Sequence, residues 1–207
     1  MKSLEENTDG RLSRGMARKT LLLDAAARIV AESGADALTH RAVAKLAEVS
    51  LASVTYHFPS SHDLRRATFE HAGSRIGLQF AGLVNASLDI EALPEICANF
   101  TAALVTDHRT DTITVFEMIL AAGHDPQLSS VASLLNDRLA KLLKPYLRSK
   151  AAAQTVSAAI QGLVLTALAI DRPNGGSWIS GAVSDLIRRY RFPPESGRSS
   201  IASRTRK

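Results

Sequence analysis

The segment 39–58 combines hydroxyl side chains at two helix starts with a run of small polar side chains, a set that suits contact with DNA. Thr39 and Ser50 are both good N-cap residues, and each precedes an apolar pattern of helical period. The joint between these two short helices is brief, so the helices must cross steeply, and the small Ala44 lets them approach closely. This size and pattern predict a helix-turn-helix, and DNA is the first partner to consider.

The second helix of the pair has one apolar side and one side that can enter a major groove. Val54 and Phe58 anchor it, opposite an inner face of Val43, Ala44 and Leu46 on the first helix. Hydroxyl and imidazole groups can reach phosphates or base edges, a methyl group can meet thymine, and the helix N-terminus attracts a phosphate. The outward residues are Leu51, Ala52, Ser53, Thr55, Tyr56 and His57. Because this helix has no Arg, Asn or Gln, strong bidentate base recognition cannot come from it, and specificity would depend on weaker contacts, the flanking arm or DNA shape.

The string ALTHRAVAKLAEVSLASVTYHFPSSHDL, preceded by TLLLDAAARIVAESG, resembles the N-terminal DNA-binding domain of the TetR (tetracycline-repressor-like) transcriptional regulators. The similarity covers about residues 18–66. An amphipathic helix pair inside an ordinary all-α protein is the plain alternative, and the resemblance outweighs it. The most specific matches are Thr39, Ala44, Val49, Ser50, Tyr56, Phe58, Pro59 and Ser60.

The resemblance makes the second helix the recognition helix, with Tyr56 and His57 at phosphate-contacting positions and Thr39 as a phosphate-contacting cap. Glu48 departs from the family pattern because Gly is usual in this turn, and a non-glycine residue there is mildly strained. Ser61 stands where Lys is frequent at the start of the next helix, which removes a phosphate contact. The full set of expected DNA-binding residues is Thr39, Arg41, Lys45, Ser50, Leu51, Ala52, Ser53, Thr55, Tyr56, His57 and Ser61.

The composition indicates an all-α protein with a real core. The chain has 207 residues, of which 45% are hydrophobic and only 5% aromatic, and no alternating strand pattern appears. The single cysteine, Cys97, excludes an internal disulfide. Its apolar helical surroundings indicate a buried structural thiol rather than a nucleophile or a redox sensor.

The net charge of +5 is concentrated at the two ends of the chain. Residues 11–66 hold 9 Lys/Arg against 5 Asp/Glu, residues 67–187 hold 8 against 11, and the last 20 residues hold 7 against 1. At the front, a basic arm could reach a minor groove or the DNA backbone. Its basic residues are Arg11, Arg14, Arg18 and Lys19. The basic tail after Pro193-Pro194 is Ser- and Arg-rich, so a solvated disordered tail is expected, with non-specific DNA attraction as the alternative.

Caps and breakers divide the rest of the chain into further helices. Asp125-Pro126 is an N-cap with a first-turn proline and begins a helix, which Pro145 should kink or shorten. Residues 173–176 are a helix breaker. The expected helices cover 61–83, 93–107, 112–122, 125–149, 151–170 and 177–191. The predicted organisation is a flexible basic N-terminal arm (1–17), a three-helix helix-turn-helix domain (18–66), a helical ligand-binding and dimerisation domain (67–192) and a disordered basic tail (193–207).

Two apolar stretches raise the question of a membrane. Residues 16–23 open like a signal peptide, but Asp24 and Arg28 break the required apolar core. Residues 151–170 carry no charge over a span long enough to cross a bilayer, yet Ala dominates and several residues are polar. A buried helix of a soluble, cytoplasmic protein is therefore expected.

The resemblance also carries expectations for the C-terminal half, by helix count and placement. In the TetR family this region encloses a ligand pocket and gives its last two long helices, here 151–170 and 177–191, to a two-fold dimer; small residues such as Ala158, Ala159 and Gly162 suit a close helix approach. The homodimer would hold two recognition helices about 34–36 Å apart on a pseudo-palindromic operator. A small-molecule effector would release the DNA, and repression is the family tendency.

The identity of the effector does not follow from the sequence. Reasonable pocket-lining residues are Phe100, Phe116, Met118, Ile119 and Trp178, although each also suits plain core packing. The competing function is an architectural or partner-recruiting DNA-binding protein without a small-molecule ligand. A closed apolar cavity in the C-terminal half would favour the ligand, whereas a solid core would favour the partner.

No cofactor, metal site or enzymatic activity is predicted. His108 lies near Asp107 and Asp111, and His124 adjoins Asp125, but neither group matches a tight metal-ligand motif, and helix-end capping accounts for both. The sequence contains no Gly-rich phosphate loop, no G-x-S-x-G elbow, no H-E-x-x-H and no paired cysteines.

Overall fold

The computed structural model describes residues 2–86, 90–170 and 175–192. The described residues form α-helices joined by short turns, without a β-strand among them, which confirms the all-α prediction. The helices are α1 (Lys2–Ser33), α2 (His40–Leu46), α3 (Leu51–His57), α4 (Ser61–Ala86), α5 (Leu93–Val105), α6 (Arg109–Ala122), α7 (Pro126–Leu143), α8 (Lys150–Ala169) and α9 (Gly175–Tyr190).

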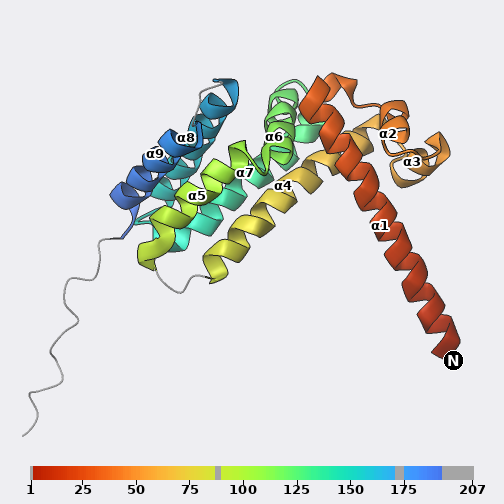
Figure 1. Cartoon of the computed structure of the whole chain (residues 1–207), viewed down its shortest axis with the longest axis horizontal. Helices are drawn as coiled ribbons and strands as arrows, with labels where there is room; N and C mark the ends of the chain where they lie inside the picture. Colours follow the sequence, from red (N-terminus) through yellow and green to blue (C-terminus); the bar gives the residue numbers. More distant parts are fainter. Residues whose placement is uncertain (1, 87–89, 171–174, 193–207) are drawn as a thin grey trace, which may run out of the picture.

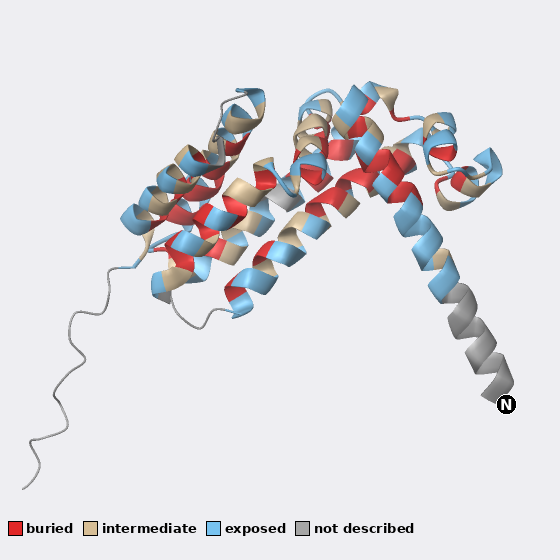
Figure 2. Cartoon of the chain, in the orientation of Figure 1, coloured by how far each residue is buried: buried red, intermediate tan, exposed pale blue. Residues whose placement is uncertain are grey.

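The molecule is elongated, and its two ends are built from different helices (Figure 1). Helices α1, α2 and α3 lie at one end, and α5, α8 and α9 lie at the other. The long helix α4 runs from the first group to the second, and α6 and α7 fill the space between them. The first part of α1 projects away from the rest of the chain and is exposed where its side chains are described (Figure 2).

The first hydrophobic core lies under the helix-turn-helix and is shared with helices from the C-terminal half. Leu22 of α1, Val54 of α3 and Phe69 of α4 are fully buried in it. Met118 of α6 and Leu128 of α7 belong to the same cluster. The DNA-binding unit is therefore held in place by the helices behind it as well as by its own three helices.

The second hydrophobic core lies between α5, α8 and α9, with the far end of α4 packed against it. Val156 and Val164 of α8 are buried in this core, beside Ile179 of α9. By length and composition α8 is also the one described helix that could cross a membrane. One face of it packs in the core and the other is exposed, as in a helix of a water-soluble protein.

Local signals account for several helix boundaries. Asp125 accepts a hydrogen bond from the Gln127 amide at 2.9 Å and caps α7, as predicted. Pro145 ends α7 early: the helix stops at Leu143, and a 3₁₀ turn follows where the sequence suggested a helix to residue 149.

Two expectations about local structure change. The segment 1–17, predicted as a flexible arm, is from Lys2 onward the beginning of α1, because no strong helix breaker separates it from the helix that follows. Leu46 was expected on the inner face of α2 but is 38% exposed, because the next residue, Ala47, takes the inward position. The predicted tail, 193–207, lies outside the described residues.

The turn between α2 and α3 forces Glu48 into a left-handed backbone conformation. Its φ is 53°, the only positive φ of a described non-glycine residue, and this is the position where the TetR pattern has glycine. A residue with a side chain pays about 1–2 kcal/mol of strain in this conformation. Glycine avoids that strain but loses more chain entropy on folding, so its net advantage is smaller.

Glu48→Gly should raise the free energy of unfolding by about 0.5–1 kcal/mol, because glycine adopts this φ without strain. Glu48→Val should lower it by about 1 kcal/mol, because a β-branched side chain fits this region worst. Urea unfolding of the three proteins measures both changes. Equal stability of the glycine and valine variants would show that the turn is not strained.

Candidate nucleic-acid interface and ligand pocket

Side-chain caps at two helix starts define the shape of the helix-turn-helix. The Thr39 hydroxyl accepts a hydrogen bond from the Ala42 amide at 3.1 Å, and the Ser50 hydroxyl accepts one from the Ser53 amide at 3.2 Å. Both caps were predicted. His40 adds a tie between the two helices, since its Nε2 lies 2.7 Å from the carbonyl oxygen of Phe58. The start of α2 and the end of α3 are thus held together by a polar contact as well as by apolar packing.

The outward surface of α3 is the one the sequence predicted. Val54 and Phe58 are buried beneath it. Leu51, Ala52, Thr55 and Tyr56 are exposed, and Ser53 and His57 are partly exposed. Tyr56 is 82% exposed, an unusual position for a large aromatic side chain unless it meets a partner.

The polar groups on this surface differ in what they can donate. The Thr55 hydroxyl bonds back to the carbonyl oxygens of Leu51 and Ala52, at 3.2 and 3.1 Å, so its methyl group is the part most free to meet a base. The hydroxyl hydrogens of Thr39 and Ser50 remain available to a phosphate, because both hydroxyls act as acceptors in their caps. Arg41 and Lys45 are exposed on α2 and supply positive charge beside α3.

The start of α4 is less suited to a phosphate than the sequence suggested. Ser61 is exposed as its first residue. Ser60 and Asp63 form a reciprocal cap: the Ser60 hydroxyl donates to Asp63 at 2.6 Å, and the Asp63 amide donates to Ser60 at 3.1 Å. This hydrogen bond lowers the pKa of Asp63, so a carboxylate already occupies the positive end of the helix.

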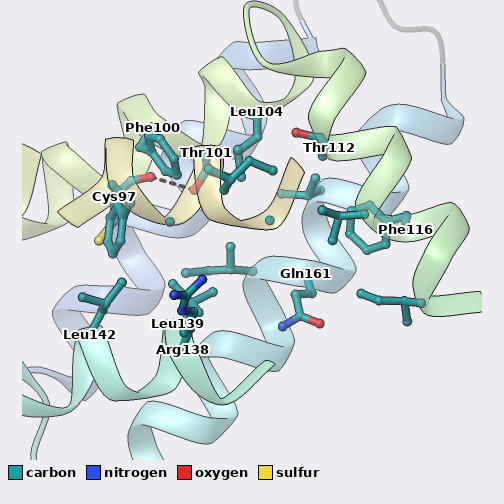
Figure 3. A pocket seen from close by; sticks show the side chains of 18 residues that line it. Cys97, Phe100, Thr101, Leu104, Thr112, Phe116, Arg138, Leu139, Leu142 and Gln161 are labelled. Carbon is teal, nitrogen blue, oxygen red and sulfur yellow. Dashed lines mark hydrogen bonds between the residues drawn. The ribbon is translucent and has the colours of Figure 1, made fainter. Parts of the chain in front are cut away.

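An apolar pocket lies in the C-terminal half, surrounded by five helices. Its volume is about 130 Å³. Its walls come from α4, α5, α6, α7 and α8, including Ile76, Phe100, Phe116, Leu139 and Val164. Figure 3 shows these walls, with α5 on one side and α7 and α8 on the other.

Three of the five predicted ligand-binding residues line this pocket, namely Phe100, Phe116 and Ile119. The other two, Met118 and Trp178, do not line this pocket. Met118 points the opposite way on α6 and is fully buried in the first core, and Trp178 of α9 packs on the outer side of the second core. Adjacent residues on one helix face different sides, so a run of apolar residues does not reveal which of them meets a cavity.

Cys97 also lines the pocket and is buried, as predicted. Burial raises the pKa of its thiol to about 12. The thiol is therefore protonated at neutral pH, which agrees with a structural role rather than a nucleophilic one.

A charged cluster joins the DNA-binding unit to the pocket helices. Asp24 of α1 contacts two side chains of α4, His71 at 2.9 Å and Arg75 at 2.6 Å. Arg75 also contacts Asp111 of α6 at 3.0 Å. One guanidinium on α4 thus bridges carboxylates on α1 and α6.

Two further hydrogen bonds connect α6 with α1 and with the turn that follows α1. The Thr114 hydroxyl donates to the carbonyl oxygen of Ala27 in α1 at 2.9 Å. The Glu117 carboxylate accepts from the Ala35 amide at 3.3 Å. Helix α6 therefore carries pocket residues on one side and fixes the position of α1 with the other.

The acidic and histidine residues weighed above for metal binding do not assemble into a metal site. Among the described residues, no group of three or more His, Cys, Asp or Glu side chains could hold a metal ion. Asp125 caps α7, whereas Asp111 does not cap a helix end and pairs with Arg75 instead.

Burial raises the pKa of Asp111 above its ordinary value of 3.8, with a smaller opposing effect from Arg75 and His71. The protonated carboxyl is then favoured in the folded state, so the stability that it contributes is present below pH 3.8 and is lost as the pH rises through the raised pKa. Asp111→Asn should flatten this part of the profile of unfolding free energy against pH. Urea unfolding at a series of pH values measures it, with the substitution of an exposed residue of α9, Asp185→Asn, as the control. An unchanged profile in Asp111→Asn would rule out this assignment.

The comparisons with known proteins agree with the geometry of both sites. The model of the bacterial regulatory proteins of the tetR family matches residues 22–68, and that of the tetracyclin repressor-like C-terminal domain matches residues 88–190. Among curated proteins, none matches.

Solved structures give the same result. The multidrug binding protein EbrR complexed with proflavin is 31% identical, over 82% of this chain and 99% of its own, with a TM-score of 0.60. Its imidazole complex is 28% identical over 87% and 98%, with a TM-score of 0.66. A TetR-family member from Streptomyces coelicolor A3, SCO1917, is 29% identical over 82% and 97%, with a TM-score of 0.69. The chain belongs to the TetR family of DNA-binding transcriptional regulators.

Proposed function

We propose that this protein is a cytoplasmic homodimeric repressor that binds a pseudo-palindromic operator and is released from it by a small-molecule effector. The observation that carries the proposal is the outward face of α3, where Leu51, Ala52, Thr55 and Tyr56 are exposed on a helix anchored from behind. In a major groove this face would use Tyr56 and the cap hydroxyls for phosphates, and the methyl groups of Ala52 and Thr55 for thymine.

The exposed face of α8 supports the proposed dimer. Its exposed residues include one helical stripe of mostly small and apolar side chains, flanked by the polar Gln154 and Thr166: Ala151, Thr155, Ala158, Gly162, Leu165 and Ala169. A side chain added at Gly162 would meet nothing within 4 Å, so the fold of a single chain does not require glycine there. Paired stripes from two copies, flanked by α9, would form a four-helix interface and set the spacing of the two α3 helices.

The pocket supports an effector over the alternative of an architectural or partner-recruiting protein. A solid core in the C-terminal half would have favoured a protein partner, whereas this half holds a partly open pocket of about 130 Å³ with mostly apolar walls. The similarity to EbrR, a multidrug binding protein solved with small molecules, points the same way.

The shared helices provide a route from the effector to the DNA. Gly73, Ile76 and Gly77 line the pocket on either side of Arg75 in α4, and Thr112 follows Asp111 in α6. A ligand that shifts α4 relative to α6 would change the Asp24–Arg75–Asp111 contacts and tilt α1. A coupling of about 1–3 kcal/mol would lower operator affinity five- to about 150-fold.

The first test concerns DNA docking. Lys45→Ala should reduce the steepness of log affinity against log salt by about 1, because one phosphate charge is no longer neutralised. Tyr56→Phe should weaken binding to every DNA sequence with little change in that slope, because only a neutral hydrogen bond is lost. Fluorescence anisotropy over a salt series measures both, with exposed Lys141→Ala on α7 as the matched control. Wild-type binding by both variants would mean that this face does not meet DNA.

The second test concerns the dimer. Ala158→Arg should convert the protein to a monomer of 22.2 kDa that remains folded, because Ala158 is exposed in the single chain. Operator affinity should fall by at least about tenfold, since the second half-site contact is lost. Ser130→Arg, on an exposed part of α7, is the control. Sedimentation velocity reports the mass, and a dimer of unchanged stability in Ala158→Arg would exclude α8 from the interface.

A further inference from the structure

The lining of the pocket is mostly apolar, and the charge that it carries is positive. Arg138 of α7 is the one charged residue among the pocket-lining side chains that the structure describes, and no carboxylate lines the pocket. The uncharged polar residues are Thr101, Thr112 and Gln161, and the rest of the lining is glycine, cysteine or apolar. We infer that the pocket binds small organic anions, an apolar body with one carboxylate, and discriminates against amines. This inference rests on the proposed function only in calling the anion an effector.

Arg138 lines the pocket and is exposed, so it can receive a carboxylate that enters from solvent. Figure 3 shows its guanidinium and the Gln161 amide on the α7 and α8 side of the pocket, opposite Phe100 and Leu104 of α5. Its hydrogen-bond partner among the described residues is neutral and the bond is long: Nη1 donates to the Ser74 hydroxyl at 3.3 Å. The ion pairs among the described residues do not include Arg138. The guanidinium therefore keeps donors for a planar, bidentate contact with a carboxylate.

The two threonine hydroxyls do not compete for this role. Thr101 donates to the carbonyl oxygen of Cys97 at 2.7 Å, and Thr112 donates to that of His108 at 2.9 Å. Both hydroxyl hydrogens are used within their own helices. Gln161 gives one amide N–H to the Ser157 hydroxyl at 3.5 Å and keeps the other. Arg138 and Gln161 are thus the side chains whose N–H groups can meet a ligand, and the charge of Arg138 places the anion at the α7 side of the pocket.

The remaining wall determines the body of the ligand. Phe80, Phe100 and Phe116 present aromatic surface, and the cavity volume of about 130 Å³ is close to the roughly 150 Å³ of a cavity that holds one benzene molecule. One ring with a short acidic side chain fits this space. An ammonium group would lie near a guanidinium with no carboxylate in the described lining to pair with it, which is unfavourable.

The position of Arg138 also connects this ligand with the DNA-binding unit. Its partner Ser74 lies on α4 directly before Arg75, which bridges α1 and α6. A carboxylate that draws the guanidinium away from Ser74 would remove a contact between α7 and α4. The charge of the ligand, and not only its bulk, would then act on α4, whose Arg75 contacts α1 of the DNA-binding unit.

The test compares three probes of similar size, phenylacetate, phenylacetamide and 2-phenylethylammonium, by isothermal titration calorimetry of the full chain without DNA. Phenylacetate should bind about tenfold more tightly than the amide, as expected for one charge-assisted contact at a partly exposed site, and the ammonium most weakly. Arg138→Gln should remove the preference for phenylacetate over the amide. Lys141→Gln, which removes a charge from the same helix outside the pocket, should leave it within about twofold of wild type.

A second variant locates the site. A side chain added at Gly77 would meet nothing within 4 Å, so Gly77→Leu should fill the pocket and abolish binding of phenylacetate and of the amide. Equal affinity for all three probes, no binding of any of them, or an unchanged preference in Arg138→Gln would overturn the inference. If phenylacetate binds through Arg138 but leaves the DNA affinity unchanged, the inference stands, and release by an effector is the part of the proposed function that fails.

Discussion

The structure depends on two helices that each pack in two places at once. Helix α4 contributes Leu64 and Phe69 to the core beneath the helix-turn-helix, and Phe80 and Val84 to the core of the C-terminal half. Helix α6 places Met118 in the first core and lines the pocket with neighbouring residues. Because helices are stiff and cores are close-packed, neither helix can move at the pocket without a response at the DNA-binding end. This shared packing is the physical basis of the proposed regulation.

Polar contacts at the crossing of α1, α4 and α6 make that packing directional. Apolar surfaces alone tolerate small shifts, whereas the contacts from Arg75 to Asp24 and Asp111 hold only within hydrogen-bond distance. Asp111 is buried, and its ionised form is disfavoured there, so the pair adds little stability of its own. The Arg75–Asp111 pair instead fixes the position of α6 relative to α4, and a ligand between the two helices can alter that position.

The parts of the molecule that local sequence determines were predictable. N-caps at Thr39, Ser50 and Asp125, together with apolar periodicity, gave the helix-turn-helix, the start of α7 and the outward face of α3. The sequence also showed that residue 48 departs from the glycine of the TetR pattern, and the turn holds Glu48 at a positive φ.

The features that local sequence did not reveal depend on contacts between distant helices. Met118 and Trp178 are apolar like the residues that line the pocket, and only the packing of α6 and α9 decides which way they point. Arg138 had no local signal, since an exposed arginine in a polar stretch of α7 lines a pocket only through the packing of the other helices beside it. The early end of α7 had a signal in Pro145, but its exact position did not follow from it.

The central claim, a dimeric and sequence-specific regulator, is tested most directly by selecting bound fragments from the genomic DNA of the source organism, with purified protein at physiological salt. The account predicts enrichment of one or a few pseudo-palindromes whose half-sites lie one helical turn, about 10 base pairs, or a multiple of it apart. Salt-sensitive binding without any sequence preference would contradict it and would favour an architectural protein.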